Sequence, residues 1–177
     1  MSEPLSIRLR VATADLHRRV EDGVDILRCT ESREGTVELM LRMEAFYRTL
    51  EPRLAQALAG LVPDEYLVAR APRLCADLGA LSSAWQPLPE PSLPPDADGL
   101  GALYVLEGAA IGGQVIARHL DARLGFRSAF FGGEGVGPRW RAFRALLDAS
   151  DEAGVIEGAT ATFLAFEAAV VREAALA

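Results

Sequence analysis

The chain has 177 residues, 50% of them apolar and 24% charged, which is typical of one folded domain with a sizeable core. This composition excludes a disordered, collagen-like or disulfide-scaffold protein, and no stretch approaches the ~18 uninterrupted apolar residues of a membrane span. The net charge of −7 argues against nucleic acid or an anionic membrane surface as a partner. Cys29 and Cys75 form no metal motif, so we expect reduced, buried thiols and a cytoplasmic single domain over residues 1–177.

Apolar residues recur at steps of three and four along nearly the whole chain, which indicates helices. Pro52 is expected to kink or split the second helix, and Pro72 to break the third. Ser2 or Ser6 is a candidate cap for the first. The predicted helices cover residues 5–28, 33–59, 63–84, 99–124, 138–149 and 152–174.

Two segments interrupt this pattern. Residues 86–95 hold five of the ten prolines and are predicted to be an extended surface loop, after which Asp96 or Asp98 can cap the next helix. Five glycines make residues 125–137 a second loop. Hardly any segment alternates with period two, so the predicted fold class is all-α.

The first helix carries a polar stripe in which Arg10, Thr13, His17 and Glu21 follow one another at steps of three and four. Residues so spaced lie on one helix face, with the carboxylate one turn after the imidazole. A carboxylate there can accept the imidazole Nδ1–H and leave Nε2 free to bind a metal. The alternative is an ordinary solvated pair, and that alternative stays open from the stripe alone.

The fourth predicted helix contains Gly108, Gly112 and Gly113 within an apolar run, where each glycine costs roughly 0.5–1 kcal/mol relative to alanine. Gly108 and Gly112 lie on one face, so the helix backbone is accessible there to a flat ligand. Close packing of two helices would explain the same glycines. His119 follows on this helix and is predicted to be a surface or helix C-terminal residue.

These segments together resemble the heme oxygenase family, and its bacterial, phytochrome-associated members look most similar. The stripe, preceded by Leu9, is similar to the family's proximal helix. The run from Tyr104 to Gln114 is similar to its distal helix, and residues 130–143 resemble the segment that follows. The chain departs from some members at Ala109, where they carry an aspartate that orders water, and this leaves proton delivery unassigned.

The resemblance implies a single-domain helical bundle with heme, both cofactor and substrate, between the proximal and distal helices. His17 would bind the iron, Glu21 and Thr13 would lie at the heme site, and Arg10 would pair with a propionate. The backbone of the distal glycines Gly108, Gly112 and Gly113 would cover the other face, with Gly108 and Gly112 directing oxidation to one meso carbon. Arg141 and Arg144 are further candidates for the propionates.

The family reaction yields biliverdin, CO and ferrous iron from heme and O2. Electrons would come from an external ferredoxin- or flavodoxin-type reductase system, because the chain has no flavin or dinucleotide motif. That donor is expected to dock on Arg8, Arg10, Arg18 and Arg19. The product could serve a bacteriophytochrome, or iron could be the wanted product. Two other functions remain open: a non-catalytic heme or bilin carrier of this fold, and a helical interaction module.

Overall fold

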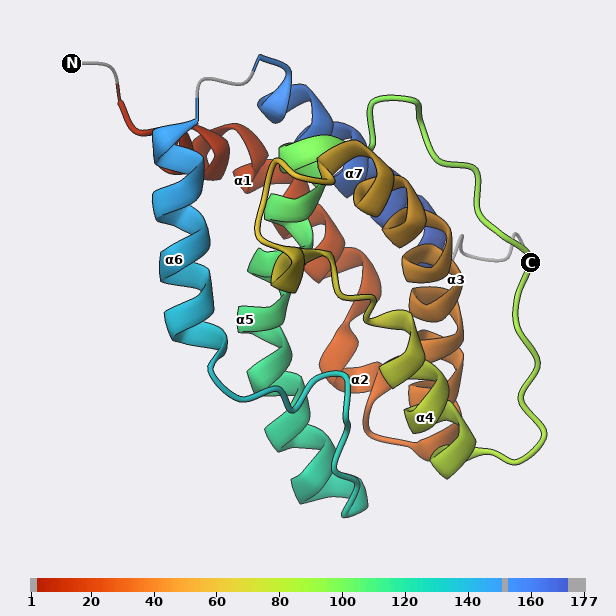
Figure 1. The fold of residues 1–177 in the computed structure, drawn as a ribbon. Coiled ribbons are helices and arrows are strands. Elements are labelled where there is room, and N and C mark those ends of the chain that lie inside the picture. The colour runs from red at the N-terminus through yellow and green to blue at the C-terminus, as the bar shows by residue number, and fades with distance from the viewer. Residues whose placement is uncertain (1–2, 151–152, 172–177) are drawn as a thin grey trace.

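The computed structural model describes residues 3–150 and 153–171, and within these ranges it contains helices and no strand. The elements are α1 (Leu5–Val24), α2 (Ile26–Cys29), α3 (Arg33–Leu58), the 3-10 helix η1 (Asp64–Leu67), α4 (Ala71–Leu81), α5 (Gly99–Leu124), α6 (Val136–Ala149) and α7 (Val155–Val170). Figure 1 shows their arrangement as a helical bundle. The prediction of an all-α fold is confirmed.

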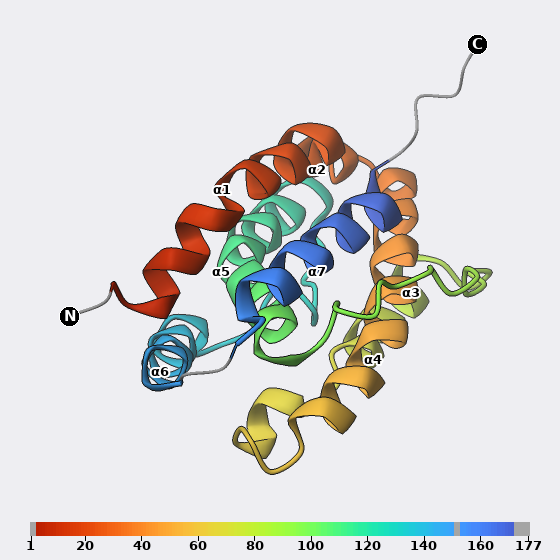
Figure 2. The same cartoon turned by 90° about the horizontal axis from the view of Figure 1, so that it is seen from above.

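Helix α5 runs through the bundle and packs against α7, α6 and α3 (Figure 2). Helix α7 also packs along α1, so α1 and α5 share one partner. The interior is filled by large apolar side chains that are fully buried, among them Met40, Phe46, Leu103 and Phe143. The close crossing of α5 and α7 depends on Gly101, because a Cβ there would lie 2.2 Å from the Val155 carbonyl oxygen.

The first predicted helix is interrupted, contrary to the continuous helix expected over residues 5–28. Asp25 adopts the left-handed conformation (φ 41°), and its N–H donates to the Glu21 carbonyl, which ends α1. Its carboxylate then accepts the Arg28 N–H and starts α2. The capping prediction for Ser6 is wrong, since Pro4 precedes the helix and Ser6 instead binds the Asp148 carboxylate of α6. The other candidate, Ser2, lies outside the described residues.

Pro52 lies inside α3 without splitting it, so that alternative is wrong. Proline removes the hydrogen bond to the carbonyl four residues earlier and its ring crowds that carbonyl, but the buried Leu50 and Leu54 on either side hold the helix in the core. The predicted break near Pro72 in the helix over 63–84 is confirmed: the segment forms η1 and α4, separated at residues 68–70, and α4 ends at Leu81. Pro72 itself lies in the first turn of α4, where its fixed φ suits a helix start.

The later boundaries agree better. Helix α5 has the predicted bounds, with Asp98 at its N-cap position but without a side-chain cap hydrogen bond. Residues 86–95 form no helix or strand. Helix α6 begins two residues before the predicted Pro138. Helix α7 is shorter than the predicted range 152–174, of which positions 152 and 172–174 lie outside the described residues.

One helix in the described part of the chain, α5, is long and apolar enough by composition to cross a membrane. Its most apolar window has a mean hydropathy of 1.5, and half of that window is buried inside the fold. A buried core helix has these same properties, so they are weak evidence for a membrane span.

Candidate functional site

The imidazole of His17 is held by the carboxylate one turn later. His17 Nδ1 lies 3.3 Å from Glu21 Oε2, and both side chains are more than half exposed. The ring also meets Phe163 of α7 edge-on, with 6.0 Å between centroids. With Nδ1 facing this carboxylate, the neutral tautomer protonated at Nδ1 is favoured, and that tautomer has its lone pair on Nε2. This nitrogen has no hydrogen-bond partner among the described residues, so a metal ion could bind it.

Contacts around Tyr104 relate α1 to α5. Thr13 is buried, and its hydroxyl donates to the Leu9 carbonyl at 2.8 Å. Burial raises the pKa of the Tyr104 phenol, and a side-chain hydrogen bond with Thr13 acts in the opposite direction. His17 and Gly108 each follow this contact by one helical turn on their own helices. The imidazole and the first glycine of the glycine face therefore each lie one helical turn beyond the same contact between α1 and α5.

The glycines of α5 have different surroundings. A Cβ on Gly112 would meet nothing within 4 Å, whereas one on Gly108 would contact the Trp140 ring at 3.6 Å, and one on Gly113 would lie 3.3 Å from the Phe131 ring. Gly101 is the glycine that close helix packing requires. Helix packing therefore does not explain Gly112, whose face is open.

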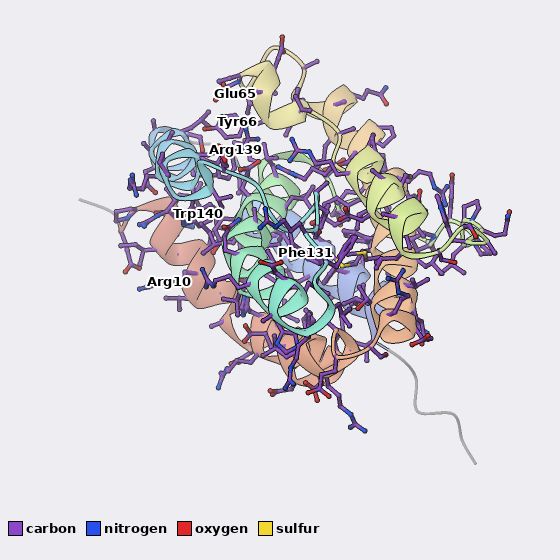
Figure 3. All side chains as sticks on the ribbon, turned by 90° about the horizontal axis from the view of Figure 1, so that it is seen from below. Arg10, Glu65, Tyr66, Phe131, Arg139 and Trp140 are labelled. Carbon is purple, nitrogen blue, oxygen red and sulfur yellow. The ribbon has the colours of Figure 1, made fainter. Side chains whose placement is uncertain are left out.

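Two arginines approach Tyr104 from different helices. Arg10 of α1 and Arg144 of α6 both lower the pKa of the Tyr104 phenol through their charges, against the larger effect of burial. Arg144 Nη2 also donates weakly to Ser6 Oγ at 3.4 Å. Neither guanidinium forms an ion pair with a residue that the structure describes. Figure 3 shows Arg10 on the side of the molecule where Trp140 lies. These cations could receive an anionic group.

Sequence reasoning missed the buried acids that hold the surroundings of α5. Asp77 of α4 accepts hydrogen bonds from Ser128 Oγ (2.6 Å) and from the N–H groups of Ala129 and Phe130, which fixes the loop after α5. Glu107 precedes Gly108 and is 2% exposed. Of these acids, only Glu107 could have been recognised from the sequence, because a lone carboxylate in an apolar helix needs a buried partner.

The comparisons with known proteins agree on one family. No family profile matches the chain. A heme oxygenase of Xanthomonas campestris pv. campestris (strain 8004) is 35% identical over 114 residues, which are 59% of this chain and 69% of that protein. The chain belongs to the heme oxygenase family. Two solved heme oxygenase structures have the same fold, each with a TM-score of 0.72.

The first of these, from Leptospira interrogans, is 14% identical and covers 95% of this chain and 98% of its own. The second, from Neisseria meningitidis, is 22% identical and covers 96% of this chain and 91% of its own. At these identities the likeness supports the fold alone. The predicted family and its helical fold are thus confirmed, while the phytochrome-associated subtype stays a prediction.

Other predicted residues of this heme oxygenase have different outcomes. Arg18 and Arg19 are paired with Asp15 and Glu167, so half of the predicted arginine patch on α1 is already neutralised. Arg8 and Arg10 form no ion pair with a described residue. The candidate propionate residue Arg141 lies 3.7 Å from the position that a Gly137 Cβ would take, and it forms no ion pair with a described residue.

The prediction of a surface or C-terminal position for His119 is wrong. His119 is half-buried within α5, and its Nε2 is buried without a hydrogen-bond partner among the described residues.

The two cysteines are free but only half-buried, so the prediction of buried thiols is wrong in degree.

Proposed function

We propose that this chain binds heme between α1 and α5, with His17 Nε2 as the axial ligand, and degrades it as heme oxygenases do. The observation that carries the proposal is the His17–Glu21 pair, which leaves Nε2 without a partner one turn beyond the Thr13–Tyr104 contact. The open face of Gly112 supports it, because a flat ligand could approach the backbone there.

On the proximal side, Glu21 would orient the ring and increase the electron donation of Nε2. Second partners of this kind fix the tautomer of a metal-binding histidine. Phe163 limits rotation of the ring from the side of α7. Thr13 is buried, and its interaction with Tyr104 links α1 to α5, whereas its bond to the Leu9 carbonyl lies within α1.

On the distal side, Gly108 and Gly112 would present backbone rather than side chains to the ligand, whereas the third predicted glycine, Gly113, is covered by the protein. Gly113 is buried against Phe131, so its part is to let the following loop approach α5. Gly108 and Gly112 are the two positions at which a side chain would enter the ligand space. Because these two positions carry no side chain, they would determine how closely each edge of the heme approaches α5. They would thereby determine which meso carbon is oxidised.

The propionates of heme fit the cationic group at Tyr104. Arg10 would form a charge-assisted hydrogen bond with one carboxylate, and Arg144, whose charge also lowers the pKa of the Tyr104 phenol, would serve it as well. The phenol is itself a donor to a carboxylate. Binding at this end would orient the macrocycle with its opposite edge toward the rest of α5.

When bound, heme iron would supply the binding and activation of O2. The reaction needs heme, O2 and a reductase, and the family product is biliverdin with CO and ferrous iron. A neutral imidazole donates less electron density to iron than a thiolate does, which suits oxidation of the porphyrin edge. We propose that the electron donor is a reductase system of the ferredoxin or flavodoxin type. We further propose that the protein acts in the cytoplasm and that its biliverdin is used by a bacteriophytochrome.

The test is a hemin titration followed by turnover under air with a ferredoxin reductase system. The wild-type protein should give a saturable one-to-one Soret complex, which is replaced by biliverdin absorption. His17→Ala should lose the axial signature and the turnover, with free imidazole restoring part of both. A Soret band that persists while the donor reduces the iron would indicate a carrier instead. Absence of a saturable complex would refute heme binding altogether.

A further inference from the structure

A buried ion-pair group lies directly before the glycine face of α5. Arg139 of α6 donates to Glu107 through both Nε to Oε2 and Nη2 to Oε1, each at 2.8 Å. Arg70, just before α4, donates to the same carboxylate. Glu107 is 2% exposed, and its single negative charge lies against two guanidinium groups. Three elements of the fold meet at this one side chain.

Arg139 is fixed on two further sides. Its Nη2 donates to the Glu65 carbonyl at 3.0 Å, and its guanidinium lies over the Tyr66 ring with 4.5 Å to the centroid. Figure 3 shows Arg139, Tyr66 and Glu65 close together beside the start of α6. A planar guanidinium has one available position when it is held by two hydrogen bonds to one carboxylate, by a carbonyl and by a stacked ring. The first turn of α6 is therefore fixed relative to α5.

The residue after Arg139 is Trp140, whose ring lies over Gly108. The ring is 3.6 Å from the position of a Gly108 Cβ, and its centroid is 5.5 Å from that of Tyr104. No such ring covers Gly112, one turn further along. Trp140 thus occupies one end of the glycine face and leaves the other end open. A flat ligand on this face would meet the indole edge.

Stability alone is a poor explanation for the Glu107 group. A buried ion pair often stabilises no more than well-packed apolar residues would, whereas breaking it by removing one partner is strongly destabilising. The bidentate Arg139–Glu107 pair and the stacking of Arg139 on Tyr66 do fix the position of the first turn of α6. The side chain that this geometry places nearest to the glycine face is Trp140.

We propose that Trp140 is the wall that sets how heme lies on the glycine face, and that Glu107 is a positioning residue that acts through Arg139 to hold Trp140 there. This inference rests on the proposed function. It assigns Trp140 a role in specificity for the meso carbon, and it gives Glu107 no contact with heme.

The experiment compares Glu107→Gln, Trp140→Leu and the double variant in the full chain. The readouts are the hyperfine-shifted heme methyl resonances of the ferric cyanide complex, which report how heme lies, and the rate of hemin dissociation. Trp140→Leu should change the methyl pattern and speed dissociation about three- to tenfold, the size of ~0.6–1.4 kcal/mol. Glu107→Gln should change the pattern in the same direction, and the double variant should match Trp140→Leu, because the two residues act in series.

Glu90→Gln is the matched control, since Glu90 pairs with Arg48 at the surface and should leave the methyl pattern unchanged. Should Glu107→Gln fail to fold, Arg139→Lys keeps the charge but loses the fork, and it carries the same expectation. Additive effects of the two single variants, or an unchanged pattern in Trp140→Leu, would overturn the inference. A wild-type chain without a saturable hemin complex would instead refute the proposed function.

Discussion

Gly112→Ala separates helix packing from ligand binding as the reason for the glycines of α5. The added Cβ would meet nothing within 4 Å in the protein itself. Alanine should then gain its full helical preference, about 0.8–1 kcal/mol over glycine in a helix interior. For a chain of this size that gain raises Tm by roughly 2–4 °C. A bound macrocycle, however, would meet the new methyl group at the position that glycine leaves free.

The predicted cost to hemin affinity follows from overpacking. Inserting a methyl group into a filled contact costs typically about 1–3 kcal/mol. Hemin should therefore bind about 5- to 150-fold more weakly to Gly112→Ala than to the wild type. Stability and binding would change in opposite directions, which a purely structural glycine cannot produce. The assays are thermal unfolding without hemin and a hemin titration of the same preparation.

Two other glycines provide matched controls. A Cβ on Gly79 of α4 would also meet nothing within 4 Å, so Gly79→Ala should raise Tm to a similar extent with no change in hemin affinity. At Gly101 a Cβ would lie 2.2 Å from the Val155 carbonyl oxygen, so Gly101→Ala should lower Tm. The reasoning is refuted if Gly112→Ala lowers Tm as Gly101→Ala does, or if it raises Tm and leaves hemin affinity unchanged.

Further predictions concern α1. His17→Ala should change the free energy of unfolding of the hemin-free protein by no more than about 0.5 kcal/mol, because the side chain is largely exposed, and a large loss measured by urea unfolding would indicate a structural role. Glu21→Ala should weaken hemin binding or turnover by about 10- to 100-fold, as loss of the partner of a metal-binding histidine does, and equal titrations of variant and wild type would contradict the assigned orientation. Arg10→Gln should weaken binding of hemin by up to about fivefold, as expected for an exposed ion pair, and should leave hemin dimethyl ester binding unchanged. Equal losses for both porphyrins would show that Arg10 does not contact a propionate.

Local sequence signals predicted the helices where the determinants are themselves local. Both ends of α5 are where they were expected: Gly125 adopts the left-handed conformation (φ 61°) that ends the helix, and Asp98 stands at the N-cap position, although its side chain makes no cap hydrogen bond. The start of α4 depends instead on Glu51, whose carboxylate accepts the N–H groups of Arg70 and Ala71. Glu51 is about twenty residues away in the sequence, so no local pattern marks this cap. Burial raises the pKa of Glu51, while these two bonds act in the opposite direction.

The same distinction applies to the candidate site. The His17–Glu21 pair is a contact between neighbouring turns of one helix, so residue spacing was sufficient to predict it. The approach of Trp140 to Gly108 and the convergence of Arg10 and Arg144 on Tyr104 join helices far apart in the sequence. The residue types suggested which chemical groups these side chains could bind. Only the packing of α1, α5 and α6 shows which side chains lie near enough to one another to bind the same ligand.

Helix α5 changes character at Gly108, and this change argues for a ligand rather than a second protein helix. Every residue from Leu100 to Glu107 is buried, whereas beyond Gly108 only Gly113 and Leu120 are. The sequence does not become polar at this point: Ile111 and Val115 are 40% and 50% exposed, next to the open face of Gly112. A helix interface would bury these apolar side chains and fill the glycine position. A planar apolar molecule that rests on backbone would cover both, and His17, on the helix that shares α7 with α5, could bind its metal from the other side.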